Sequence, residues 1–306
     1  MKTQRRKITI RTLAARKRKG IPITMVTAYD ATMARLMDAA GVDAILIGDS
    51  LGMVVQGHEH TLEVTLEHMI YHTSCVARAT KFAHVVADMP FGSYHVSPQQ
   101  AVTSAIRLIK EGSAEAVKLE GGAERVDAIR AITEAQIPVM GHVGLTPQSV
   151  HRIGGFRIQG RTDKAADRVF EDALAVAEAG VYSIVLESIP HDLAERISNA
   201  VSVPTIGIGA GSRCDGQVLV CYDMLGFDEA FEPRFLKKFA RLGPQIVSAV
   251  QAYGDEVRER SFPTLEHSFE GLQSEKPGEK NQAEGAQESA EGEGDQTALY
   301  NSGKSA

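Results

Sequence analysis

Residues 116–120 read Ala-Val-Lys-Leu-Glu, a short apolar run that ends on a carboxylate, and this pattern recurs along the chain. Each such run is nearly continuous in hydrophobicity, as expected of strands that are buried on both faces. Eight runs alternating with helical patterns over about 230 residues predict an α/β fold, a (β/α)8 TIM barrel, with a doubly wound sheet as the alternative. The eight runs cover residues 22–27, 44–48, 84–87, 116–119, 138–141, 182–186, 203–208 and 218–222.

The segments between these runs carry the start and stop signals of helices. Ser97 to Gln100 read Ser-Pro-Gln-Gln, which is typical of a capping box with proline at the first helical position. Gly112 is placed to cap the carboxyl end of this helix, and Gly180 is placed to end a later one. These signals support alternating strands and helices.

Composition favours a soluble enzyme. The chain has 306 residues, of which 43% are hydrophobic and 24% are charged. Its longest apolar runs are about eight residues, so we expect no membrane span. The three cysteines form no Cys-x-x-Cys pair, which excludes a disulfide scaffold and indicates inert thiols in a reducing cytoplasm.

The first twenty residues are strongly basic, with nine Lys and Arg and no acid. Such a segment could be a transit peptide or an RNA-binding arm, but it lacks aromatic residues and serine. We expect it to dock as a short helix, because it carries the apolar side chains Ile8, Ile10, Leu13 and Ala14.

The last 36 residues, 271–306, hold seven acids and three lysines and almost no large apolar side chains. Such a segment cannot offset its ordering entropy by burial, so we predict a disordered acidic tail. We therefore expect a single catalytic barrel domain over residues 1–270. The chain between the two charged ends carries a net charge of −11, which is unsuited to a nucleic-acid partner because phosphate contacts need clustered cations.

Acidic residues follow four of the predicted strands, namely Asp49, Asp88, Glu120 and Glu187, and His142 follows a fifth. Catalytic groups of (β/α)8 barrels sit at the carboxyl ends of the strands. The alternative is that each acid caps the next helix. Four acids after four different strands favour one shared site.

Carboxylates without a cysteine pair or an evident pair of histidine ligands favour a hard cation, and Mg²⁺ prefers oxygen ligands. Lys118 and Glu120 lie two residues apart on one strand, so they point to the same face. A lysine inside a barrel is costly unless it is paired or functional. We expect it to meet a substrate carboxylate or a developing oxyanion.

Several ordered motifs resemble the ketopantoate hydroxymethyltransferase family. The resemblance extends from about residue 8 to the segment 266–269 and leaves out the acidic tail. The motifs are VTAYDAT, ILIGDSLGMVVQGHEHTLEVTLEHMIYHT, VVADMPFGSY, VKLEGG, VMGHVGLTPQSV, GGFRIQGR and PTIGIGAG.

This resemblance implies a Mg²⁺-dependent barrel that assembles as a homodecamer in the cytoplasm. It implies transfer of a hydroxymethyl group from 5,10-methylenetetrahydrofolate to 3-methyl-2-oxobutanoate, giving 2-dehydropantoate for pantothenate and coenzyme A synthesis. The remaining alternatives are a Mg²⁺-dependent α-keto-acid lyase or phosphonomutase on the same barrel, and a non-catalytic scaffold. The partners implied are small molecules, with neither nucleic acid nor membrane.

By the same resemblance, six residues of the motifs carry roles. Glu187 is the proton acceptor. The metal-site carboxylates are Asp49, Asp88 and Glu120, and the residues that contact the keto acid are Asp49, Ser50, Asp88 and Lys118.

Overall fold

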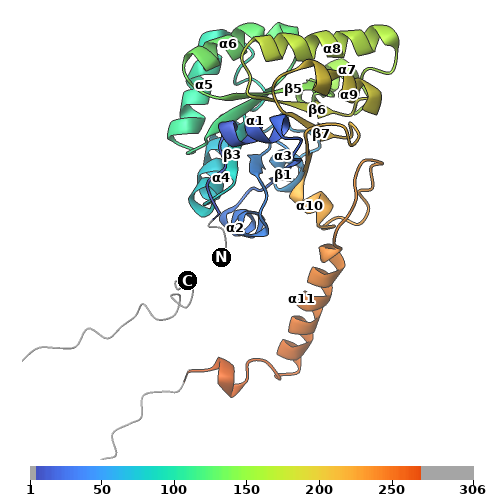
Figure 1. The fold of residues 1–306 in the computed structure, drawn as a ribbon. Coiled ribbons are helices and arrows are strands. Elements are labelled where there is room, and N and C mark those ends of the chain that lie inside the picture. Colours follow the sequence, from blue (N-terminus) through green and yellow to red (C-terminus); the bar gives the residue numbers. More distant parts are fainter. Residues whose placement is uncertain (1–4, 270–306) are drawn as a thin grey trace, which may run out of the picture. The chain divides into compact units, whose positions relative to one another are not determined.

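The computed structural model describes residues 5–269, and within them eight parallel strands close into a barrel (Figure 1). Each strand pairs with the next in the sequence, and the last pairs with the first. The predicted (β/α)8 barrel is thus confirmed, and the doubly wound alternative is wrong. The strands are β1 (Ile23–Thr27), β2 (Ala44–Ile47), β3 (His84–Asp88), β4 (Ala116–Glu120), β5 (Val139–Gly144), β6 (Ser183–Glu187), β7 (Thr205–Ile208) and β8 (Gly216–Leu219).

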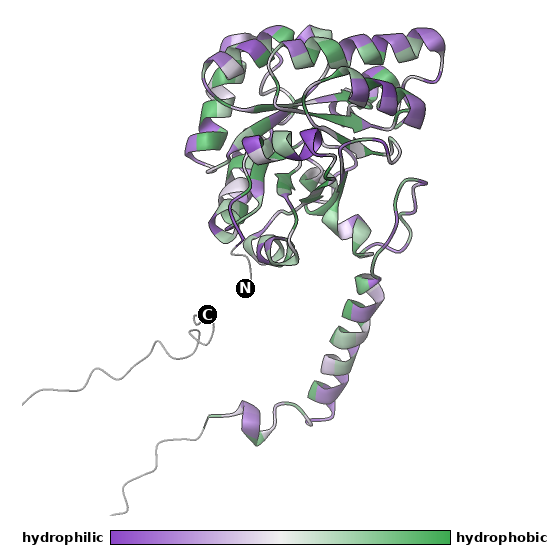
Figure 2. Ribbon diagram, viewed as in Figure 1, coloured by the Kyte–Doolittle hydropathy of each residue, from purple (hydrophilic) through white to green (hydrophobic). Residues whose placement is uncertain are grey.

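Helices follow most of the strands and surround the barrel. The strands are mostly hydrophobic, whereas the surrounding helices carry both hydrophobic and hydrophilic residues (Figure 2). The α-helices are α1 (Ile10–Arg18), α2 (Ala31–Ala40), α3 (Leu51–Val54), α4 (Leu66–Ala79), α5 (Pro98–Lys110), α6 (Val126–Glu134), α7 (Val150–Ile153), α8 (Asp163–Glu178), α9 (His191–Ala200), α10 (Cys221–Met224) and α11 (Leu242–Arg258), and the 3₁₀ helices are η1 (Ala123–Arg125), η2 (Pro147–Ser149) and η3 (Leu265–His267).

The strands separate two apolar layers. Side chains alternate along a strand, so Val85 packs into the layer beneath the helices while Val86 packs into the barrel interior. The interior layer also holds Met25, Met140 and Val185, each from a different strand. Two residues further along these strands, the inward positions become polar. The apolar interior therefore supports a polar layer at the carboxyl ends.

The basic N-terminal segment docks as predicted. Thr9 caps α1 through a capping box with Thr12, and Leu13 is buried against the interior layer. Two cations of α1 reach acids of the barrel: Arg16 pairs with Asp43 at 2.6 Å, and Lys17 pairs with Asp215 at 2.7 Å. Acids of the barrel thus neutralise part of the positive charge of this segment.

Two of the predicted element ends that differ from the structure have a clear physical reason. The strand expected over 218–222 stops at Leu219, and Cys221 already opens α10; one apolar run continues through both elements, so hydrophobicity alone cannot separate them. Ser97 does cap α5, but the C-cap residue of that helix, which ends at Lys110, is Glu111 rather than Gly112. Gly112 instead allows a close approach, since a Cβ there would lie 2.6 Å from the Leu108 carbonyl oxygen.

The chain divides into two compact units, residues 1–251 and 252–306, and α11 runs across the boundary. The predicted tail 271–306 and the predicted domain end at residue 270 lie outside the described residues and stay predictions. No helix between residues 5 and 269 is long and apolar enough to span a bilayer.

Candidate active site

The register of β3 against β4 creates a buried ion pair. Asp88 lies directly beside Lys118 in this parallel pairing, and the lysine Nζ is 2.5 Å from Oδ1 of Asp88. Both side chains are about 95% buried or more. The lysine expected to be paired or functional is therefore paired with one of the predicted site carboxylates.

Asp49, just beyond the end of β2, joins this pair. Its backbone N–H donates to Oδ2 of Asp88 at 3.1 Å. Next to it, the Ser50 hydroxyl is hydrogen-bonded to the Tyr29 hydroxyl at 2.8 Å. Gly48 keeps this corner open, because a Cβ there would lie 2.7 Å from Oγ of Ser50.

His142 links two further carboxylates. It lies beside Glu120 in the register of β4 with β5, and its Nδ1 is 3.4 Å from that carboxylate. On its other side, Nε2 lies 3.2 Å from Oε2 of Glu187, at the end of β6. Neither ring nitrogen is aligned for a hydrogen bond, so the attraction between these groups is ionic. His142 thus bridges the predicted metal carboxylate and the predicted base.

Gln148 and Tyr94 hold the carboxylates from outside the strands. The Gln148 side-chain amide donates to Asp49 at 2.7 Å, and its backbone N–H donates to Glu120 at 3.0 Å. The Tyr94 hydroxyl donates to the Gln148 side-chain oxygen at 2.6 Å. Tyr94 lies in a loop and Gln148 in the short 3₁₀ helix η2, and neither follows a periodic pattern, so sequence reasoning missed them. Their only sequence signal is membership of the family-like motifs.

The buried site carries more negative than positive charge. Asp49, Asp88, Glu120 and Glu187 supply four carboxyl groups, against two basic groups. Burial raises the pKa of Asp49 well above its ordinary value, and the neighbouring Asp88 and Glu120 carboxylates raise it further. Burial also raises the pKa of Asp88, although Lys118 opposes this effect. Negative charge is therefore held in this site at a cost.

The excess of negative charge raises the pKa values of the two basic groups, Lys118 and His142. Burial lowers the pKa of Lys118, but the three nearest carboxylates outweigh burial, so its pKa lies above the ordinary value. Burial and Lys118 also lower the pKa of His142, yet Glu120 and Glu187 raise it overall to about 9. For Glu120, burial is outweighed by His142 and Lys118, so its pKa is lowered. At neutral pH, Lys118 and His142 are therefore protonated, and the Glu120 carboxylate between them is ionised.

A divalent cation would suit this charge balance. With both basic groups protonated, four ionised carboxylates would leave two uncompensated negative charges, and the donor atoms are all hard oxygens. Among residues 5–269, however, no three His, Cys, Asp or Glu side chains form a ready ligand set. Lys118 is bonded to one oxygen of Asp88, and Gln148 is bonded to one oxygen of Asp49. Such a site fits Mg²⁺, which keeps several of its waters and needs only one or two carboxylates.

All six predicted site residues lie at the carboxyl ends of β2, β3, β4 and β6. The alternative that their acids cap helices is wrong. The N-cap residues of the helices and 3₁₀ turns that follow these strands are not acids; they are Ser50, Ser97, Gly122 and Pro190.

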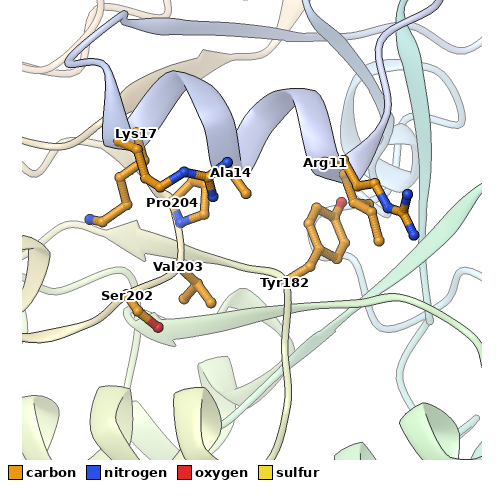
Figure 3. Close-up of a pocket in the computed structure, with 9 residues that line it drawn as sticks. Arg11, Ala14, Lys17, Tyr182, Ser202, Val203 and Pro204 are labelled. Carbon is orange, nitrogen blue, oxygen red and sulfur yellow. The ribbon is translucent and has the colours of Figure 1, made fainter.

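A separate pocket of about 660 Å³ lies where α1 crosses the segments leading into β6 and β7 (Figure 3). Arg11, Ala14 and Lys17 line it from α1, with Tyr182 and Val203 on the barrel side. These barrel residues precede their strands, so the pocket belongs to the amino-terminal end of the barrel. None of the six predicted site residues lines it.

Comparisons with known proteins agree with the motifs. Residues 7–265 match the family model of ketopantoate hydroxymethyltransferase. The chain is 58% identical over 269 residues to the 3-methyl-2-oxobutanoate hydroxymethyltransferase of Anaeromyxobacter sp. (strain Fw109-5), covering 87% of this chain and 88% of that protein. It is 56% identical over 269 residues to the protein of the same name from Pelobacter propionicus, covering 88% of this chain and 100% of that protein.

Among solved structures, a phosphonopyruvate hydrolase in complex with oxalate and Mg²⁺ matches with a TM-score of 0.55. The match covers 85% of this chain and 93% of that one at 14% sequence identity. At this identity the likeness concerns the fold alone.

Proposed function

The chain belongs to the ketopantoate hydroxymethyltransferase family of enzymes, and from this premise we propose that it transfers a hydroxymethyl group to 3-methyl-2-oxobutanoate. The one-carbon donor is 5,10-methylenetetrahydrofolate and the product is 2-dehydropantoate. The observation that carries this proposal is the convergence of four carboxyl groups with Lys118 and His142 at one end of the barrel.

In this proposal Glu187 removes the proton from C3 of the keto acid. Its side chain is 20% exposed, whereas Asp88, Glu120 and His142 are almost fully buried. A base must reach substrate as well as hold its own position, and His142 orients the Glu187 carboxylate at 3.2 Å. The carbon that loses the proton then forms a bond to the methylene carbon of the folate. In the net reaction both bonds from the methylene carbon to the folate nitrogens break, water supplies the hydroxyl oxygen, and the nitrogens take up one proton from C3 and one from water as tetrahydrofolate leaves.

The remaining residues bind and orient the keto acid. Lys118 balances negative charge at its carboxylate and carbonyl end, where the charge of the enolate develops. Ser50 and the paired carboxylates Asp49 and Asp88 line the same corner. Gln148 keeps Asp49 in place through its 2.7 Å hydrogen bond.

Asp49, Asp88 and Glu120 would hold Mg²⁺. When bound, this ion supplies Lewis-acid polarisation of the keto-acid carbonyl. Support comes from the excess of buried negative charge and from the hard oxygen donors. The Mg²⁺ in the matched phosphonopyruvate hydrolase is consistent with such a site on this fold.

We also propose that the protein is a cytoplasmic homo-oligomer, as a decamer. Support comes from α11, none of whose residues is buried. Ile246, Val250, Tyr253 and Val257 lie three or four residues apart, so they share one face of the helix, and each is more than 40% exposed. An apolar stripe of this kind is typical of an interface.

Proton NMR of 3-methyl-2-oxobutanoate in D₂O tests the proposed base. The parent protein with Mg²⁺ should exchange the C3 proton, and Glu187→Gln should slow this exchange by about 10²–10⁴-fold. Keto-acid binding should change little, because Glu187 takes no part in holding the metal. Glu171→Gln, which removes an exposed acid of α8, is the matched control and should behave as the parent.

Exchange at the parent rate in Glu187→Gln would mean that another group is the base. Simultaneous loss of keto-acid binding would contradict the separation of base and metal site. Formation of 2-dehydropantoate after addition of 5,10-methylenetetrahydrofolate tests the transfer step independently.

A further inference from the structure

The segment 151–161, between α7 and α8, has an unusual surface composition. It reads HRIGGFRIQGR, with Arg152, Arg157 and Arg161 and no acid. Within it, Phe156 is 53% exposed and Ile158 is 55% exposed. Single exposed apolar side chains are common in proteins. Two of them within three residues, among three arginines on an otherwise acidic barrel, form an amphipathic cationic surface.

Both ends of this segment are fixed to the candidate active site. Gln148, three residues before it, hydrogen-bonds Asp49 and Glu120. Near its other end, the Gln159 backbone N–H donates at 2.9 Å to the carbonyl of Ser188, the residue after Glu187. The segment therefore leaves one wall of the site and returns beside the proposed base.

The backbone of the segment depends on glycine. Gly154 and Gly155 have φ angles of 76° and 111°, which place them in the left-handed region. A Cβ at either position would meet nothing within 4 Å, so packing does not explain these glycines. They turn the chain directly before Phe156. The segment thus presents its aromatic side chain on a fixed turn.

We propose that segment 151–161 binds the folate co-substrate, with Phe156 and Ile158 against its planar rings and the arginines near its glutamate carboxylates. The inference rests on the proposed function, because it concerns the second substrate of the same site. A planar aromatic system joined to an anionic tail matches this surface in both shape and charge. Its position beside Glu187 brings the one-carbon unit close to the carbon that loses its proton.

Another exposed aromatic residue near this end of the barrel, Phe91, fits less well. Phe91 follows β3, and its ring packs on His95 with 4.7 Å between ring centroids. The segment 89–97 contains no arginine or lysine. Segment 151–161 is therefore a better match for an aromatic anion than segment 89–97.

Isothermal titration calorimetry of the full-length protein with tetrahydrofolate tests this inference. Phe156→Ala should weaken folate binding by about 10-fold, within the range that base–aromatic stacking supplies. Arg157→Ala should weaken binding more for triglutamyl than for monoglutamyl tetrahydrofolate, and added salt should reduce that difference. The dissociation constant of 3-methyl-2-oxobutanoate should stay within twofold of the parent value. Phe156→Leu should fall between Phe156→Ala and the parent.

Two exposed residues elsewhere give matched controls. Leu36→Ala on α2 removes an apolar side chain that is 58% exposed, and Arg130→Ala on α6 removes an exposed cation. Both should bind folate as the parent does. Parent-like folate binding by Phe156→Ala and Arg157→Ala would overturn the inference while transfer by the parent continued. A parent that binds no folate and forms no 2-dehydropantoate would overturn the proposed function itself.

Discussion

Each end of the barrel buries a histidine, and the two histidines differ in the acidic groups that surround them. At the amino-terminal end, His84 lies 3.2 Å from Glu115, which also pairs with Lys7 at 2.9 Å. One carboxylate there contacts two basic side chains. At the carboxyl end, His142 lies between Glu120 and Glu187.

The difference fits a structural role for the amino-terminal end and the proposed catalytic role of the carboxyl end. Burial raises the pKa of Glu115, but His84, the Val85 N–H and Lys7 outweigh burial and lower it to about 2. At the other end, burial raises the pKa values of Asp49 and Asp88, and neighbouring carboxylates raise them further. An unbalanced buried charge is a cost that a purely structural end avoids, and a bound cation and a polar substrate can offset it.

The largest effect is expected from breaking the buried pair at the carboxyl end. Lys118→Met leaves Asp88 buried and unpaired, which should lower the free energy of unfolding by about 3–5 kcal/mol. Urea unfolding with circular dichroism measures this loss. Lys110→Met, at an exposed position of α5, should change stability by less than about 0.5 kcal/mol.

The double variant Lys118→Met/Asp88→Asn sharpens this prediction. It removes both charges, so much of the lost stability should return while transfer activity stays absent. A single variant as stable as the parent would show that the carboxyl end tolerates unpaired charge without cost.

The pH dependence of stability should differ between the two ends. The pKa of His142 rises from an ordinary value of 6.5 to about 9 on folding, so its contribution is complete below pH 6.5 and is lost as the pH rises through 9. This contribution is about 3 kcal/mol. The pKa of Glu115 falls from 4.5 to about 2, so its contribution is complete above pH 4.5 and is lost as the pH falls toward 2. Because Glu115 is 36% exposed, its contribution is reduced to about 1 kcal/mol.

Chemical denaturation of metal-free protein between pH 3 and pH 9.5 checks both windows. The stability difference between the parent and His142→Asn should shrink at alkaline pH, whereas that between the parent and Glu115→Gln should shrink at acidic pH. A His142→Asn difference that did not vary with pH would mean that this imidazole stays neutral in the folded protein.

The smallest effect is expected at the helix that closes the amino-terminal end. Thr9→Ala removes the cap of α1 and should cost about 1 kcal/mol, measured as a lower midpoint in urea. Transfer activity should not change, since α1 lies at the end opposite the candidate site. Thr32→Ala, at an exposed position of α2, serves as the control. If Thr9→Ala lost activity at temperatures where it stays folded, the structure of the amino-terminal end would affect the candidate site at the carboxyl end, contrary to this prediction.

The sequence by itself determined that the chain forms a barrel and that its polar groups lie at the carboxyl ends of the strands. Apolar runs and caps such as Ser97 depend on neighbouring residues only, so they can be recognised without the fold. The acids Asp88 and Glu120 follow such runs directly, and in a parallel barrel the ends of all strands meet at one face. The docked helix around Leu13 was predictable for the same reason.

Only the tertiary structure decided which of these groups touch. The pairing of Asp88 with Lys118 depends on strand register, which joins residues thirty positions apart. Gln148 reaches the carboxylates from the 3₁₀ helix η2, and Tyr94 reaches Gln148 from a loop; no periodicity in the sequence describes either segment. The end of β8 and the start of α10 at Cys221 are set by packing within a single apolar run. Hydrophobic patterns are local in sequence, whereas contacts across a closed barrel exist only once the chain has folded.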